Sequence, residues 1–182
     1  MMSRRKFMSC AGVLSSFFLY SPITFAEWAL FLPPFTERSL KFYNIHTGES
    51  LSTTYWLEGK YVESSMKEIF YILRDFRTNE VKPIDINIFD ILFLITKKLE
   101  TDEPVHVISG YRSPETNYKL RREGRGVAKH SLHIEGRAID IRIPNVPLPL
   151  LRDTALSLKA GGVGYYPNSQ FVHIDTGRVR HW

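Results

Sequence analysis

Two short segments near the end of the chain constrain the fold more than any other feature. A-I-D-I-R-I at 138–143 and F-V-H-I-D at 171–175 alternate aliphatic and polar side chains, the pattern of a β-strand buried on one face only. The aliphatic positions predict a core on one side of both strands. Asp140, His173 and Asp175 then point to the opposite side, so the polar strand faces are available for chemistry.

The rest of the pattern combines helices with strands. Met66, Ile69, Phe70, Leu73 and Phe76 recur at three- and four-residue spacing, which indicates an amphipathic helix. The expected elements are a hairpin over 38–56, helices over 62–77, 85–100, 113–124 and 147–162, and strands over 104–110, 137–143, 163–167 and 171–175. The sequence therefore predicts an α+β fold, in which helices pack on one face of a small, mostly antiparallel sheet.

The first residues have the three-part layout of an export signal. Basic residues open the chain, an apolar run follows, and T-F-A precedes Glu27. Arg4 and Arg5, between a serine and a phenylalanine in S-R-R-K-F, are similar to a twin-arginine signal. The apolar run is shorter than the roughly 20 residues of a membrane span, so we expect no stable membrane anchor. The prediction is a twin-arginine-type signal peptide over 1–26, a single domain over 27–182, and a periplasmic location.

Charge and cysteine content narrow the class of protein. The formal net charge is +5, and removing the three positive residues of the signal lowers it to +2. The sequence therefore indicates no nucleic-acid partner. The only cysteine, Cys10, lies in the signal segment. An exported domain without disulfides depends on its core or on a metal for stability.

Three of the six histidines are candidates for a metal site. His130, His133 and His173 remain after the histidines of the hairpin turn, of the strand at 104–110 and of the last two residues are set aside. If the two polar strand faces adjoin, Asp140 and His173 converge, and His133 joins them from the loop before the first strand. Two imidazoles and one carboxylate suit a catalytic Zn²⁺ with an open fourth position. Histidines and aspartates on exposed strand faces are also common without a metal, and the alternation alone leaves that interpretation open.

The residues around His133 match a known signature. S-x-H-x-x-G-x-A-x-D, from Ser131 to Asp140, resembles the signature of the zinc peptidases that group D-Ala-D-Ala carboxypeptidases, lysostaphin-type enzymes and hedgehog-like domains. In that superfamily a later strand supplies the third ligand, a position that His173 matches. The resemblance covers roughly residues 38–182. It implies a hedgehog or D-Ala-D-Ala peptidase-like fold and one Zn²⁺ per chain, held by His133, Asp140 and His173.

Two further segments resemble one branch of this superfamily. S-G-Y-R-S at 109–113 is similar to the segment that carries a substrate-binding arginine, here Arg112, and the closing block from Ala160 resembles the murein endopeptidase K branch. The resemblance implies a zinc-dependent murein endopeptidase that hydrolyses the peptide cross-links of peptidoglycan, with stem peptides as its partners. Arg112 is then expected to hold a substrate carboxylate or the developing oxyanion, and Ser131 to contact substrate.

The general base expected from the superfamily is absent. Many relatives carry a glutamate three residues before the last ligand or a histidine two residues before it, and Gln170 and Phe171 occupy these positions here. Asp175, on the same strand face as His173, is a candidate for the base or for a carboxylate that orients a ligand imidazole. His130 is a second candidate, and zinc-bound water acting alone is a third interpretation.

Two other functions are consistent with the same residues. A D,D-carboxypeptidase uses the same zinc chemistry on a terminal D-alanine. A non-catalytic zinc module that binds cell-wall peptides or a protein partner belongs to another class, since hedgehog-like domains keep zinc for structural or binding roles. The missing base gives this module some weight beside the enzyme, and turnover of purified sacculi separates the two.

Overall fold

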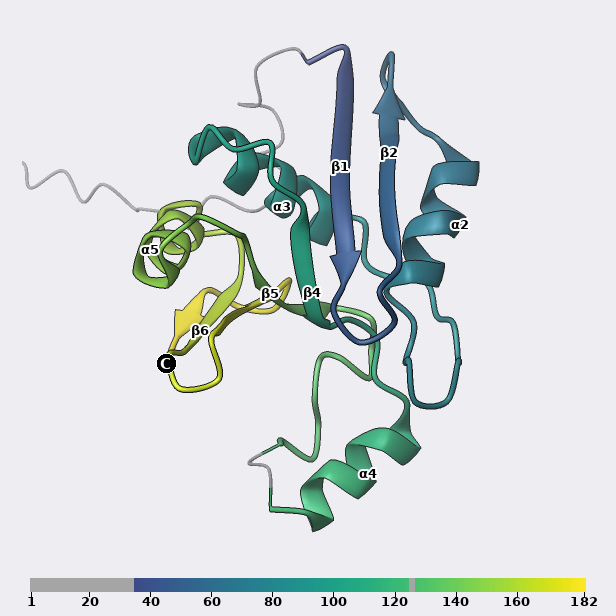
Figure 1. Cartoon of the computed structure of the whole chain (residues 1–182), viewed down its shortest axis with the longest axis vertical. Helices are drawn as coiled ribbons and strands as arrows, with labels where there is room; N and C mark the ends of the chain where they lie inside the picture. Colours follow the sequence, from purple (N-terminus) through teal and green to yellow (C-terminus); the bar gives the residue numbers. More distant parts are fainter. Residues whose placement is uncertain (1–34, 125–126) are drawn as a thin grey trace, which may run out of the picture. The chain divides into compact units, whose positions relative to one another are not determined.

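A computed structural model describes residues 35–124 and 127–182. Within these residues the chain forms four helices and one eight-stranded sheet, whose strand order is β3-β2-β1-β4-β5-β7-β6-β8 (Figure 1). In chain order the elements are β1 (Glu37–Asn44), β2 (Ser50–Leu57), β3 (Lys60–Tyr61), α2 (Glu63–Ile72), α3 (Asn87–Lys98), β4 (Val105–Ser109), α4 (Pro114–Arg122), β5 (Ala138–Arg142), α5 (Leu148–Ser157), β6 (Gly162–Tyr166), β7 (Phe171–Asp175) and β8 (Arg180–His181).

The described residues cover most of the domain predicted from the sequence. The signal peptide predicted at 1–26 and the first part of the predicted domain, 27–34, lie outside them. Among the helices of the described part, none combines the length and the apolar character needed to cross a lipid bilayer.

The sheet is mixed, which corrects the expectation of a small, mostly antiparallel sheet. β1 and β2 form the expected antiparallel hairpin, with Gly48 at positive φ in its turn. β1 also pairs with β4, and this pair is parallel. Parallel neighbours need a connection that crosses the sheet, and α2 and α3 lie in the segment that leads to β4. β6 and β8 form a second parallel pair. Hydrophobic alternation predicts a strand but not the direction of its neighbours, and the two-residue strands β3 and β8 are too short to show a pattern.

Three helices pack on one face of the sheet. α2 packs on β2, α3 on β1, and α5 on β6 and β7, and α3 also contacts α5. On β1, Leu40 and Phe42 are buried, whereas Ser39 and Lys41 on the opposite face are exposed. The aliphatic residues of β5 and β7 are at most 2 % exposed, and they are Ile139, Ile141, Val172 and Ile174. The core therefore lies between the helices and one sheet face, and the polar residues of β5 and β7 lie on the other.

The loop between β4 and α4 carries Arg112 and is held by buried contacts. Asp75 accepts hydrogen bonds from the backbone N–H and the hydroxyl of Ser113, at 2.9 and 2.7 Å. Ser113 also caps α4, as the sequence predicts. Gly110 lets the loop approach the end of α2 so closely that a β-carbon there would collide with the carbonyl oxygen of Leu73. The backbone on both sides of Arg112 is therefore fixed.

Candidate metal centre

The register of β5 and β7 brings the two polar strand faces together. The strands are antiparallel neighbours, and Asp140 lies directly opposite His173. His133 reaches the same point from the turn before β5. Nδ1 of His173 lies 2.8 Å from Oδ1 of Asp140 and 3.2 Å from Nε2 of His133, which is itself 3.3 Å from the same carboxylate oxygen. The three side chains selected from the sequence therefore converge on one point.

The small residues of the signature shape the turn that carries His133. Gly136 has a φ of +70°, and a β-carbon there would lie 2.5 Å from the carbonyl oxygen of Pro83. A side chain at this position would therefore collide with the backbone of a neighbouring segment. Ala138, the next small residue, is buried and pairs with Asp175 across the two strands.

Hydrogen bonds outside the cluster determine which nitrogen of each imidazole faces inward. Nδ1 of His133 lies 2.8 Å from the carbonyl oxygen of Gly110, and since a carbonyl only accepts, this nitrogen carries a proton. Nε2 of His173 lies 3.1 Å from Oδ2 of Asp175, which holds a proton on that outer nitrogen as well. In the neutral imidazoles, Nε2 of His133 and Nδ1 of His173 are therefore left as acceptors beside the carboxylate of Asp140.

Three acceptor atoms that face one another need a cation between them. Each of the three residues offers one ligand atom to a common point, and these atoms all lie within 4.8 Å of one another. In a tetrahedral site with metal–ligand bonds of about 2.0–2.1 Å, ligand atoms are about 3.3 Å apart, close to two of the three separations here. Both outer nitrogens donate to oxygen acceptors, the usual arrangement around metal-bound imidazoles. The donor set therefore fits a metal ion.

The charges in the cluster shift the pKa of its members. Burial alone would raise the pKa of Asp140, but His133 and His173 hold it well below its usual range. Burial alone would lower the pKa of His173, but the carboxylates of Asp140 and Asp175 raise it to about 9. In the metal-free protein at neutral pH, a proton on His173 therefore takes the place of the cation, and a metal ion that binds displaces it.

Arg112 points at the same carboxylate without forming a close ion pair. Its Nη2 lies 3.8 Å from Oδ2 of Asp140, and its contacts to Ser109 and Asn117 are long, at 3.3 and 3.4 Å. The side chain is only 10 % exposed, and within the described residues its Nε has no hydrogen-bond partner. A buried guanidinium with unused donors is suited to an anionic group of a ligand.

Asp175 is wholly buried, and donors surround its carboxylate. Oδ1 accepts from the N–H groups of Gly162 and Gly177 at 3.2 and 2.8 Å, and from Nη1 of Arg180 at 3.0 Å. Oδ2 accepts from Nη2 of Arg180 at 2.7 Å and faces His173. Burial would raise the pKa of Asp175, but the hydrogen bonds with His173 and Arg180 hold it well below its usual range. The carboxylate is therefore ionised and enclosed.

A cavity of about 460 Å³ opens beside the cluster. His130 and Ser131 lie on its wall, so the remaining candidates from the sequence are also at the site. Tyr166, Phe171 and Trp182 line it too, with the rings of Tyr166 and Phe171 stacked at 4.5 Å and the indole N–H of Trp182 donating to the Tyr166 hydroxyl at 2.8 Å. The cavity thus combines a candidate cation site, a guanidinium with long contacts and apolar rings, as ligand-binding pockets do.

Sequence reasoning missed Arg180 and Trp182. Both lie beyond the last predicted strand, in and next to the short strand β8. The signal that was available is the spacing of Gly162 and Gly164 on β6, which leaves the first two positions on one face of that strand without a side chain. A β-carbon at Gly164 would lie 2.7 Å from the indole of Trp182, so this strand face makes room for the end of the chain.

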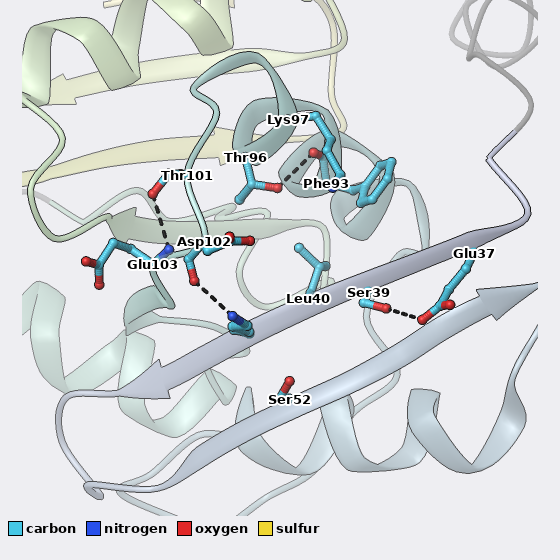
Figure 2. A pocket seen from close by; sticks show the side chains of 11 residues that line it. Glu37, Ser39, Leu40, Ser52, Phe93, Thr96, Lys97, Thr101, Asp102 and Glu103 are labelled. Carbon is cyan, nitrogen blue, oxygen red and sulfur yellow. Dashed lines mark hydrogen bonds between the residues drawn. The ribbon is translucent and has the colours of Figure 1, made fainter.

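A second hollow, of about 310 Å³, lies between β1, α3 and the loop after α3 (Figure 2). Its polar groups are paired within the protein: Ser39 donates to Glu37 at 2.8 Å, and Lys41 donates to the carbonyl oxygen of Asp102 at 3.3 Å. Of the described residues that line it, none is a histidine or a cysteine. This hollow therefore lacks the converging ligands that distinguish the cavity beside Asp140.

The chain is similar to curated proteins over almost all of its length. A family model described as peptidoglycan L,D-endopeptidase MepK matches residues 34–182. The peptidoglycan L,D-endopeptidase MepK of Escherichia coli (strain K12) is 42% identical over 180 residues, which cover 99% of this chain and 97% of the relative. A Haemophilus influenzae protein named "Probable peptidoglycan L,D-endopeptidase MepK" is 42% identical over 181 residues, which cover 99% of this chain and 95% of the relative. No solved structure matches the chain.

Proposed function

The chain belongs to the family of peptidoglycan L,D-endopeptidases that the matching model describes, and from this premise we propose that it hydrolyses peptide cross-links of peptidoglycan. It is a metallopeptidase of that family. The observation that carries the proposal is the cluster of His133, Asp140 and His173 beside a cavity that also contains Arg112. The relatives are named L,D-endopeptidases, so we expect the cleaved bond to join an L- to a D-configured residue of the stem peptides.

The metal is proposed to be one Zn²⁺ per chain, held by His133, Asp140 and His173. Two neutral imidazoles and one carboxylate are a ligand set of catalytic zinc and leave a fourth position open. When bound, zinc would polarise the scissile carbonyl and lower the pKa of a bound water toward about 7. The carbonyl of Gly110 and the carboxylate of Asp175 support this assignment, because they hold the imidazole protons on the side away from the metal.

Arg112 is proposed to bind substrate. Once a metal shares the charge of Asp140, the guanidinium is free to attract a stem-peptide carboxylate, or the oxygen that becomes negative as the amide is attacked. Its long contacts to Ser109 and Asn117 support this role, since a substrate oxygen would be a closer acceptor for the terminal nitrogens. Ser131, on the wall of the same cavity, offers its hydroxyl to the same ligand.

The proton-transfer role is proposed for His130, with Asp175 as an orienting carboxylate. Asp175 is 0 % exposed and does not line the cavity. Its two oxygens are already occupied, so a water in the cavity has no access to it. His130 is exposed on the cavity wall, and histidine is the side chain that most often acts as a general base or acid. His130→Ala should therefore keep its metal and lower turnover, and full turnover in this variant would exclude the role.

The site of action is proposed to be the periplasm, where peptidoglycan lies. Residues 1–26 are assigned as a twin-arginine-type signal peptide and 27–182 as a single zinc peptidase domain, on the support of S-R-R-K-F and the apolar run that follows it. Changing Arg4 and Arg5 to lysine should leave precursor in the cytoplasm, measured by fractionation. Continued export through the general secretory channel would contradict the twin-arginine route.

The function is tested directly by digestion of purified sacculi. Protein without its first 26 residues should convert cross-linked muropeptide dimers to monomers, measured by chromatography and mass spectrometry. EDTA should stop the reaction, and added zinc should restore it. Release of terminal D-alanine with the dimers intact would instead establish a D,D-carboxypeptidase. Binding to sacculi with no change in any muropeptide would establish a non-catalytic zinc module.

A further inference from the structure

Arg180 lies beside the metal cluster, and none of the roles described above includes it. It begins β8, which pairs in parallel with β6 and places Arg180 opposite Gly162. Nη1 of Arg180 lies 3.0 Å from Oδ1 of Asp175, and Nη2 lies 2.7 Å from Oδ2. This is the two-pronged geometry in which a guanidinium fixes both the position and the plane of a carboxylate.

Asp175 transfers this constraint to His173. Its Oδ2 lies 3.1 Å from Nε2 of the imidazole, while Oδ1 is occupied by the guanidinium and by the N–H groups of Gly162 and Gly177. With its plane fixed, the carboxylate presents a single oxygen to a single ring nitrogen. The other ring nitrogen, Nδ1, is the one that faces Asp140. A chain of contacts therefore runs from β8 to the metal cluster.

The backbone of β6 is shaped to admit this pair. A β-carbon at Gly162 would collide with the guanidinium of Arg180 and with the carboxylate of Asp175. A β-carbon at Gly164 would lie 2.7 Å from the indole of Trp182, whose ring centroid is 4.9 Å from the guanidinium carbon. The guanidinium is therefore held between a carboxylate and an aromatic ring, in a space that two glycines leave open. The side chain of Arg180 is 30 % exposed and that of Asp175 is 0 % exposed, so the pair differs from an ion pair between two exposed side chains.

We propose that Arg180 is a positioning residue of the metal centre, acting through Asp175 on His173. By fixing the carboxylate, it keeps the imidazole proton on Nε2 and the lone pair of Nδ1 directed at the metal. Without the guanidinium, the carboxylate loses two of its donors and is free to turn, and the ring gains orientations that do not ligate. The inference rests on the metal site proposed above and deepens it.

Substrate binding is the main competing assignment, because Arg180 also borders the cavity. The contacts favour positioning, since both terminal nitrogens are committed to Asp175 and Nη1 also donates to the carbonyl oxygen of Arg178 at 3.1 Å. Arg112 differs, because its contacts to Ser109 and Asn117 are long, at 3.3 and 3.4 Å. The two arginines of the cavity therefore have different roles, one toward the ligand and one toward the metal centre.

The test is the zinc affinity of Arg180→Gln, measured by competition with a chelator of known affinity. Glutamine lacks both the charge and the two-pronged geometry, so we expect zinc to bind about 10–100-fold more weakly than in the wild type. Arg180→Lys keeps the charge and loses the second prong, and its affinity should lie between the two. Arg178→Gln is the matched control, since it removes an exposed arginine two residues away with the same charge change and should bind zinc as the wild type does.

A second measurement follows the imidazole itself. In ¹⁵N NMR spectra of the zinc-loaded protein, the Nε2 proton of His173 should exchange slowly with solvent in the wild type and in Arg178→Gln, and quickly in Arg180→Gln. If Arg180→Gln folds poorly, the double variant Arg180→Gln/Asp175→Asn removes the unpaired buried charge. The double variant should fold and still bind zinc weakly.

Several outcomes would overturn the proposal. The proposal is wrong if Arg180→Gln binds zinc as tightly as the wild type and its Nε2 proton on His173 still exchanges slowly. It is also wrong if the double variant binds zinc as tightly as the wild type. Normal zinc affinity combined with weak substrate binding would assign Arg180 to the substrate and would also overturn it. Failure of the wild type to bind zinc or to digest sacculi would contradict the proposed function instead, and this is apparent before any variant is compared.

Discussion

Two buried aspartates, Asp90 and Asp140, lie in opposite kinds of polar cluster. Asp90, on α3, is surrounded by donors. Its Oδ1 accepts from Nη1 of Arg38 at 2.7 Å and from the hydroxyl of Tyr55 at 2.8 Å, and its Oδ2 accepts from the hydroxyl of Tyr61 at 3.0 Å. Asp140, on β5, instead faces the inner nitrogens of two imidazoles, whose protons are held on their outer sides.

Burial does not distinguish the two residues, since Asp90 is 4 % exposed and Asp140 is 6 % exposed. The difference is whether donors and acceptors match within the protein. The carboxylate of Asp90 has its partners within the protein, as expected of a network that stabilises the fold. The Asp140 cluster instead needs a positive charge among its acceptors, either a proton on His173 or a metal ion. A buried cluster that the protein alone leaves incomplete, next to a cavity, indicates a functional site.

The largest expected effect comes from removing the ligand carboxylate. Asp140→Ala should abolish zinc binding and lower the turnover of sacculi by more than about 10⁴-fold, about 5.5 kcal/mol of transition-state stabilisation. Metal content by mass spectrometry and muropeptide release measure the two effects. Full metal content in this variant would remove Asp140 from the ligand set.

The corresponding change in the other cluster should affect stability only. Asp90→Ala leaves the buried guanidinium of Arg38 without its anion, so the free energy of unfolding should fall by about 3–5 kcal/mol. Urea denaturation measures this loss. Zinc binding by the folded fraction should be unchanged, and a weakened zinc site in the folded protein would show that the two clusters are coupled.

Each cluster contains one arginine, Arg38 beside Asp90 and Arg112 beside Asp140. Both have a buried Nε without a hydrogen-bond partner in the described residues, so only substitution distinguishes their roles. Arg112→Ala should keep zinc and lower kcat by about 10²–10³-fold, since it removes the donor that we propose to bind the substrate. Arg38→Ala should lower stability and leave kcat unchanged in the folded protein. An active Arg112→Ala would show that this guanidinium only holds its loop.

The smallest expected effect is a pH dependence in the Asp90 cluster. Burial and the Asp90 carboxylate raise the pKa of Tyr61 to about 12. Because the folded pKa lies above the unfolded value of about 10, the contribution of Tyr61 is complete below pH 10 and is lost as the pH rises toward 12. Tyr61→Phe should lower the free energy of unfolding by about 0.5–1 kcal/mol at neutral pH. It should also reduce the slope of the unfolding free energy against pH between pH 10 and 12. An unchanged slope between pH 10 and 12 would contradict the assignment.

The strand alternation predicted the polar faces of Asp140 and His173, whereas their convergence depended on the two strands being neighbours. A period of two residues places Asp140 and His173 on one face, and antiparallel pairing of neighbouring strands then sets them opposite each other. The amphipathic helices were predictable for the same reason, since their apolar residues recur with the period of the element. Both are local regularities that a single sequence contains.

What could not be predicted depends on contacts between distant residues. Arg38 and Asp90 lie 52 positions apart, and no local sequence pattern indicates that they form a pair. Arg38 is a polar residue at a core-facing strand position, so hydrophobic periodicity does not predict its partner. From the sequence, Asp175 was a candidate either for the general base or for an orienting carboxylate. Only the donors around it, above all Arg180, show that its carboxylate is enclosed and not accessible to water. The parallel pairing of β1 with β4 depends on the path of the helices between them.

The central claim is that His133, Asp140 and His173 together hold one zinc ion. X-ray diffraction from crystals of the zinc-loaded protein, recorded on both sides of the zinc absorption edge, tests it most directly. We predict a single strong anomalous peak about 2.0–2.2 Å from Nε2 of His133, Nδ1 of His173 and the carboxylate of Asp140. An anomalous peak at another site with none at this cluster would contradict the claim.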